Sequence, residues 1–198
     1  KELLIPSLLL VMALNLSSVV DSFFVGSFIG PNAVAAIELL EPVILLMTVF
    51  EWLFGLGGQI LSINKKSEFD IEGSNRYFTV SMVVSFIASV ILAILWLLFM
   101  DPLTPRLGAS AALKPLVLQY STYLAPCFVV STIAAVLTQY MRVDDHPNFA
   151  SAIIIIANVV NIIFDYLFLS AGMGMASAAL ASFIGYTVGL AACLLYIR

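Results

Sequence analysis

One stretch constrains the fold more than any other part of the chain. Ser151 to Ser170, SAIIIIANVVNIIFDYLFLS, is apolar almost throughout but carries Asn158, Asn161 and Asp165. About 20 residues at about 1.5 Å each match the ~30 Å hydrocarbon core of a bilayer. Their spacings place the three polar side chains on one stripe of a single α-helix. The stretch therefore predicts a membrane-spanning helix with a polar stripe turned away from lipid.

Two interpretations of this stripe stand side by side. Asn side chains join helices in membranes by hydrogen bonds, so the stripe could serve packing alone. A carboxylate in the hydrocarbon region costs roughly 2.5 kcal/mol or more on insertion scales, and an ionisable group there is a functional candidate by default. Asp165 therefore favours an ion or proton site over a purely structural stripe.

Composition places the whole chain in the same environment. Hydrophobic residues make up 62% of the sequence and charged residues 10%, whereas soluble domains carry about a quarter charged residues. This composition predicts an integral membrane protein, and no basic patch suggests a nucleic-acid partner. Cys127 and Cys193 lie inside apolar runs, where we expect small hydrophobes instead of a disulfide or metal pair.

The hydropathy pattern predicts an all-α bundle of six spanning helices in one domain, 1–198. Turn residues and charges separate the helices, as at Gly30-Pro31-Asn32, in the predicted charged loop 64–76, and in the proline-containing loop 101–115. Pro42 is a candidate kink site in the second helix. The predicted helices are roughly 3–28, 33–63, 77–100, 116–141, 149–170 and 175–197.

Loop charges predict the orientation of the bundle in a cell membrane. With both termini in the cytoplasm, six of the eight basic residues lie on the inner side: Lys1, Lys65, Lys66, Arg76, Arg142 and Arg198. Arg106 and Lys114 lie outside, so the arrangement obeys the positive-inside rule. Because the chain ends where its last apolar run ends, it is either a piece of a longer protein or a native half-size protein.

A second carboxylate lies within the first apolar segment, in the run VDSFFVG. Asp21 is well inside that segment, and its helix is predicted to run parallel to the helix of Asp165. The two carboxylates should therefore lie at similar depth. If the helices are neighbours, the pair can share a cation or a proton, because two such groups cannot both remain charged in a low dielectric. The alternative is that each Asp separately binds backbone groups at a kink.

Several motifs, in this order and spacing, resemble one transporter family. VDSFFVG, LLEPV in the second helix, QYMRVDDHP, NVVNIIFDYLF and GMASAALAS are similar to segments of the multidrug and toxic compound extrusion (MATE) transporters. The resemblance covers essentially the whole chain. Full-length members consist of two six-helix lobes, and this chain resembles the N-terminal lobe, so the resemblance implies a missing C-terminal lobe as its partner.

The resemblance also implies a site. Asp21 matches the carboxylate of the first helix in the family, and Asn161 with Asp165 matches the pair on the fifth helix, where the coupling H⁺ or Na⁺ binds. Ser182 lies where some members have Thr and keeps the hydroxyl ligand. The resemblance makes further residues candidates for support of this cluster through hydrogen bonds, namely Tyr120 and Tyr123 on the fourth helix, with Asn158 as the remaining polar residue of the stripe.

The acids of the second helix are weighed separately. Carboxylates in a cleft attract organic cations, and neighbouring aromatic rings add cation–π attraction. Glu41 and Glu51 are therefore candidate residues of a substrate cleft, although either could instead reach the interface or bond to a neighbouring helix. For Glu38 we favour the outer interface.

Together these features predict a cation-coupled antiporter that exports amphipathic, often cationic drugs by alternating access. No cofactor is expected beyond the coupling ion, and no catalytic constellation suggests an enzyme. Two alternatives remain. A flippase for lipid-linked oligosaccharides would share the architecture but should carry cationic side chains for pyrophosphate, and a non-transport membrane scaffold would tolerate loss of the buried Asp side chains.

Overall fold

The computed structural model describes residues 18–197, and all regular structure in this part of the chain is α-helical. The described part of the first helix is Ser18–Phe28. Five longer helices follow: α2 (Pro31–Ser67), α3 (Ile71–Leu103), α4 (Lys114–Val143), α5 (Pro147–Ser170) and α6 (Met175–Ile197). The prediction of an all-α bundle of six helices is confirmed, while the predicted residues 3–17 of the first helix, Lys1 and Arg198 lie outside the described residues.

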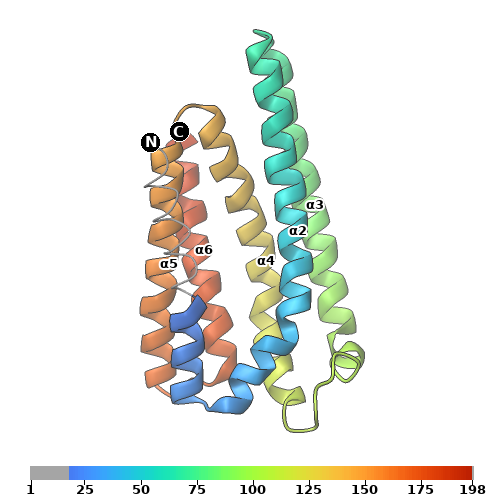
Figure 1. Ribbon diagram of the computed structural model, residues 1–198, viewed down its shortest axis with the longest axis vertical. Coiled ribbons are helices and arrows are strands. Elements are labelled where there is room, and N and C mark those ends of the chain that lie inside the picture. The colour runs from blue at the N-terminus through green and yellow to red at the C-terminus, as the bar shows by residue number, and fades with distance from the viewer. Residues whose placement is uncertain (1–17, 198) are drawn as a thin grey trace.

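The five long helices run up and down alternately, and α4 stands between two pairs (Figure 1). α2 packs along α3, and α5 packs along α6. α4 contacts both members of each pair. The described part of the first helix lies beside the lower halves of α5 and α6 (Figure 1). This arrangement brings the first helix next to the polar stripe on α5.

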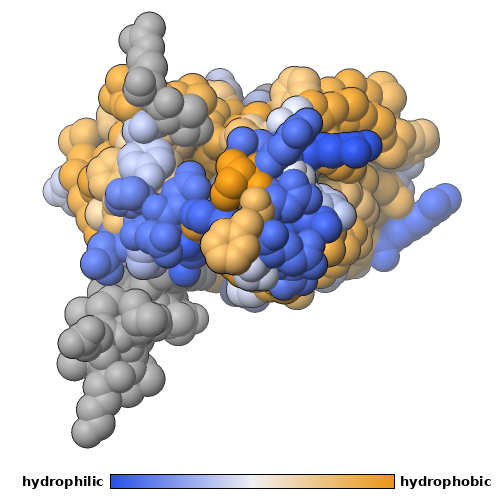
Figure 2. Space-filling view, turned by 90° about the horizontal axis from the view of Figure 1, so that it is seen from above, coloured by the Kyte–Doolittle hydropathy of each residue, from blue (hydrophilic) through white to orange (hydrophobic). Residues whose placement is uncertain are grey.

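The outside of the bundle is suited to lipid. All five long helices are long and apolar enough to cross a membrane. Seen from above, the end of the bundle has a hydrophilic centre, and hydrophobic residues cover much of the surrounding surface (Figure 2). The backbone polar groups of these helices are hydrogen-bonded within each helix, and the side chains on their outer faces are mostly apolar. Both features are what the hydrocarbon region of a membrane requires.

The predicted charged loop 64–76 is wrong. α2 continues through Lys65 and Lys66 to Ser67, and α3 already begins at Ile71. Asp70 is the N-cap residue of α3, and its Oδ1 accepts a hydrogen bond of 2.8 Å from the Gly73 amide. Charged residues can extend a helix beyond the hydrocarbon core, since the helix end is surrounded by water.

Other boundaries shift for similar reasons. α3 includes Pro102 and ends at Leu103, and α4 begins at Lys114 with a proline in its first turn, so the loop predicted at 101–115 is shorter than expected. Gly30 adopts φ 117° immediately before α2, as the predicted turn requires. α2 bends in its lower part (Figure 1), and Pro42 lies inside this helix.

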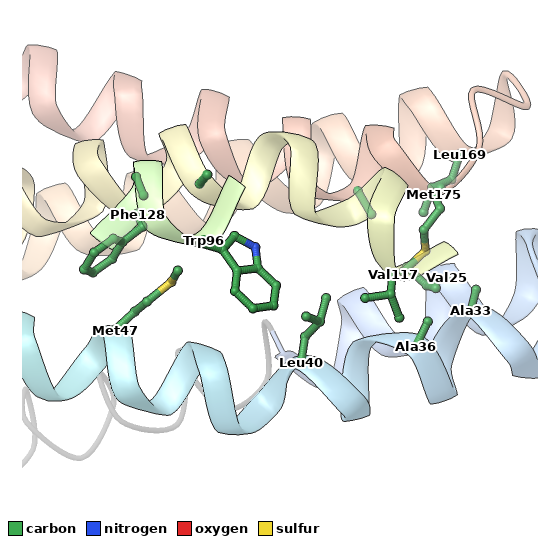
Figure 3. Packing of buried hydrophobic residues seen from close by; sticks show 13 residues of the cluster. Val25, Ala33, Ala36, Leu40, Met47, Trp96, Val117, Phe128, Leu169 and Met175 are labelled. Carbon is green, nitrogen blue, oxygen red and sulfur yellow. The ribbon is translucent and has the colours of Figure 1, made fainter. Parts of the chain in front are cut away.

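A buried apolar cluster joins the helices at the lower end of the bundle. Val25 of the first helix is fully buried with Met175 of α6 and Leu169 of α5. Leu40, Trp96 and other side chains from α2, α3 and α4 continue the cluster (Figure 3). Because Val25 belongs to this cluster, the first helix is anchored one turn from Asp21.

Candidate ion site between the first helix and α5

The α5 stripe faces the interior of the bundle as its spacing predicts. Asp165 is 1% exposed and Asn161 is 7% exposed. Asn161 Nδ2 donates to Asp165 Oδ2 at 3.0 Å and lies 3.1 Å from Ser182 Oγ on α6. One amide group therefore positions the carboxyl group on its own helix and also joins that helix to its neighbour.

A glycine allows this close approach of α5 and α6. A Cβ atom on Gly185 would lie 2.6 Å from the Ala157 carbonyl oxygen and 3.0 Å from Asn161 Cβ. Contacts this short exclude any larger side chain unless the helices move apart. Gly185 is therefore the residue that lets Asn161 reach Ser182, and small residues at helix contacts are typical of packing in lipid.

The first helix brings Asp21 to the same place. The carboxyl groups of Asp21 and Asp165 lie within hydrogen-bonding reach of each other. Phe24 and Tyr166 pack their rings together with centroids 5.7 Å apart, and Phe28 lies 6.2 Å from the same tyrosine. These aromatic contacts hold the first helix against α5 beside the two carboxyl groups. The sequence predicts a shared site only if the first and fifth helices are neighbours, and in the structure they are neighbours.

A cavity of about 260 Å³ opens beside the pair. Among residues 18–197, one oxygen of Asp21 and one oxygen of Asp165 are buried without a hydrogen-bond partner. The described residues that line this cavity include no Lys, Arg or His. They are Ser18, Asp21, Ile44, Ala157, Asn158, Asn161, Ser182 and Tyr186. Two adjacent carboxyl groups without a cation among the described residues need a bound proton or a bound cation.

Of the predicted supporting residues, one lines the cavity and the two tyrosines lie on α4 without a hydrogen bond to the cluster in the described part of the chain. Asn158 lines the cavity, and its Nδ2 donates to the Ile154 carbonyl at 2.8 Å. Tyr120 lies close enough to Asp21 and Asp165 to interact with them electrostatically. Tyr120 and Tyr123 are half-buried on α4, and among the described residues neither forms a hydrogen bond with the cluster.

The acids of α2 lie apart from this cluster. Glu38 is exposed, and Glu41 is half-buried and lines neither the cavity beside Asp21 nor the one beside Glu51. Glu51 lines a second cavity of about 210 Å³ between α2, α4, α5 and α6. Its carboxyl group forms a hydrogen bond with the Ser131 hydroxyl of α4 and lies 3.5 Å from the Thr132 hydroxyl.

Sequence reasoning missed several residues around both carboxyl centres. Ser131, Thr132 and Tyr186 were not singled out, although each borders a buried acid. A hydroxyl within an apolar helix is a weak signal, because such groups usually bond to their own backbone. The only available signal was that Ser131 and Glu51 each lie far from the ends of a long apolar helix.

The fold and the paired site define a multi-pass membrane protein with buried ionisable groups. The MatE family model matches residues 6–167. The chain belongs to the MATE family of transporters.

One curated relative is similar in sequence, and solved structures of transporters share the fold. A protein named FAD transporter from Shewanella oneidensis is 25% identical over 200 residues, which is 94% of this chain and 42% of that protein. A MOP superfamily transporter from Pyrococcus furiosus is similar with a TM-score of 0.91 at 23% identity, over 98% of this chain and 43% of that one. An inward-facing MATE multidrug resistance transporter has a TM-score of 0.86 at 23% identity, over 92% and 42%. The chain thus spans less than half the length of these relatives.

Proposed function

We propose that this chain is the N-terminal lobe of a cation-coupled antiporter, which exports amphipathic, often cationic compounds by alternating access. The observation that carries the proposal is the Asp21–Asp165 pair, held by Asn161 and opening to a cavity between helices. A second six-helix lobe is the partner that completes the transport pathway. The proposal places the lobe in the cell membrane, with the Lys65 and Lys66 end in the cytoplasm.

The coupling step follows from the charge of the pair. Two ionised carboxylates side by side repel each other in a low-dielectric interior. Binding of a proton or cation removes this repulsion and draws the first helix toward α5. The first helix leads through Gly30 directly into α2. Ion binding at Asp21 therefore changes the position of two helices together, which is the coupling that alternating access needs.

A proton suits the described geometry better than Na⁺. Asp21 and Asp165 lie within hydrogen-bonding reach of each other, so a single proton on one carboxyl group would join the pair. The Asn161 amide presents its NH₂ group to Asp165 and Ser182, and an NH₂ group is no cation ligand. H⁺ is therefore the first coupling ion to test.

The charge of the two cavities supports a cationic substrate. Asp21 lines one and Glu51 the other, and the described walls of both contain no Lys, Arg or His. Lipid-linked oligosaccharides and FAD, the compound named for one relative, carry a pyrophosphate, and these walls would repel its negative charge. Organic cations with an aromatic or aliphatic body fit these walls better.

The test is gradient-driven transport by the native-length protein in proteoliposomes. Asp21→Asn and Asp165→Asn should each abolish transport of a cationic dye driven by an imposed H⁺ gradient, because Asn cannot bind and release a proton. Each protein is also assayed under a Na⁺ gradient and with FAD as the substrate.

Glu38→Gln is the control, because Glu38 is exposed and lies apart from both carboxyl centres. Normal dye transport in Asp165→Asn would refute the assigned site. Transport of FAD in place of the dye would move the protein to the substrate class of its named relative. Folded wild-type protein that transports nothing under any gradient would favour a scaffold.

A further inference from the structure

The second cavity contains an ionisable group that the coupling site does not use. Glu51 lies in the middle of α2, more than four helical turns from either end of that helix. Its carboxyl group turns to α4, where Ser131 and Thr132 meet it, and away from lipid. Among residues 18–197 no Lys, Arg or His forms an ion pair with it. A carboxyl group so placed needs another way to balance its charge.

Ser131 can satisfy Glu51 in both of its protonation states. The Ser131 hydroxyl lies 3.1 Å from the Phe128 carbonyl oxygen as well as in contact with Glu51. When Glu51 is ionised, the hydroxyl donates to the carboxylate. When Glu51 is protonated, the carboxylic acid donates to Ser131, whose own proton turns to Phe128. Neither state leaves a buried polar group without a partner.

Thr132 is the less important neighbour. Its hydroxyl lies 2.7 Å from the Phe128 carbonyl oxygen and 3.5 Å from Glu51, so its proton belongs to the backbone contact. Ser131 and Thr132 therefore form a natural pair for comparison: adjacent residues, both hydroxyls, but only one in direct contact with the acid.

The cavity gives the proton a route. Asn158 and Tyr186 line both this cavity and the one beside Asp21, so the two carboxyl centres share a wall. Among the residues whose placement the structure describes, the titratable groups that face Glu51 are Cys127 of α4 and Tyr186 of α6, and both are ordinarily neutral near pH 7. α5 contributes only uncharged side chains to this wall, and Asp21 is the acid across it.

We propose that Glu51, with Ser131 as its hydrogen-bond partner, is a second proton-binding site of this lobe, separate from Asp21 and Asp165. The proton enters from water in the cavity, binds a Glu51 carboxylate oxygen, and returns to water when Ser131 turns back to donate. In the transport cycle this site rests on the proposed function, since a second bound proton raises the number of protons moved with each substrate molecule. Its protonation itself can be measured without transport.

The experiment is infrared difference spectroscopy of the native-length protein in lipid between acidic and alkaline pH. A protonated carboxyl group has a carbonyl-stretch band that an ionised one lacks. We expect one such band to disappear in Glu51→Gln and to persist in Glu38→Gln, Asp21→Asn and Asp165→Asn. An unchanged set of bands in Glu51→Gln would overturn the proposal, because Glu51 would then hold one protonation state throughout.

Two further variants test the site if Glu51→Gln does not fold. Ser131→Ala should shift the Glu51 band, because the acid loses its direct partner, whereas Thr132→Ala should shift it less. Equal effects of the two substitutions, or none, would overturn the role of Ser131. Dye transport without a Glu51 band would refute the second site alone, and a Glu51 band without any transport would refute only the proposed antiporter function.

Discussion

Substitution of Gly185 tests whether the α5–α6 contact builds the ion site. In Gly185→Ala the added methyl group would lie 2.6 Å from the Ala157 carbonyl oxygen, and ordinary contacts begin at 3.4 Å. Relief of this overlap requires α6 to move by about 0.8 Å. If α6 moves as a rigid body, the 3.1 Å bond from Asn161 to Ser182 lengthens to about 3.9 Å and is lost.

Three effects determine the expected change in the free energy of unfolding of Gly185→Ala. Overpacking of a well-packed contact costs about 1–3 kcal/mol, and the lost hydrogen bond costs about 0.5–1.5 kcal/mol. Replacement of glycine by alanine in a helix returns about 1 kcal/mol. The net loss of stability is therefore on the order of 1–3 kcal/mol, and Asn161 no longer connects Asp165 to α6.

The assay combines thermal unfolding in detergent with H⁺-driven dye transport by the native-length protein. Gly185→Ala should lower the unfolding temperature and weaken coupling. Gly57→Ala is the matched control, because a Cβ atom on Gly57 has no atom within 4 Å and helix propensity alone should leave stability equal or higher. A Gly185→Ala protein as stable and as well coupled as Gly57→Ala would refute the reasoning.

Two other substitutions test contacts that position the helices. Gly58→Ala should lower the unfolding temperature well below that of Gly57→Ala, because its methyl group would overlap the Ser81 hydroxyl and displace α3 from α2. Phe24→Ala should cost about 0.5–1.5 kcal/mol beyond its lost buried area, because it removes the ring contact with Tyr166, and it should also weaken H⁺ coupling by loosening the first helix. Both are measured by thermal unfolding, and the second also by dye transport.

Phe23→Ala is the control for the aromatic contact. Phe23 adjoins Phe24 but is 66% exposed, so its loss should change stability and coupling less. Equal effects of the two substitutions would argue against a specific role for the Phe24–Tyr166 contact. For Gly58→Ala, an unfolding temperature equal to that of Gly57→Ala would mean that α2 and α3 have room at this point.

The part of the site that lies on one helix could be predicted from sequence, because a helix has a known period. Asn161 and Asp165 are four residues apart, and the structure places them in direct contact on the buried face of α5. Asp21 lies on another helix, and helical period gives no information about which helices are neighbours. The sequence therefore predicts its place beside Asp165 only on the condition that the two helices are neighbours.

The rest could not be read from the sequence for two physical reasons. Glu51 and Ser131 meet across 80 positions of sequence, and neither residue type predicts the other as its partner. The α2–α3 connection was misjudged because a run of charges looks like a loop, although charges are compatible with a helix in water. Asp70 before Ile71-Glu72 was the available signal, since an aspartate N-cap with an acid in the first turn marks the start of a helix.

The central position of α4 has a consequence for how the protein is made. α4 packs against four other helices, and it is the least apolar of the five spans and the most enclosed. A nascent helix enters the bilayer from the translocon according to its own apolarity. α4 is therefore the segment whose insertion depends most on helices that are already in the membrane. Its neighbours α2 and α3 are synthesised first. They can therefore provide a protein surface for α4 to pack against as it leaves the translocon.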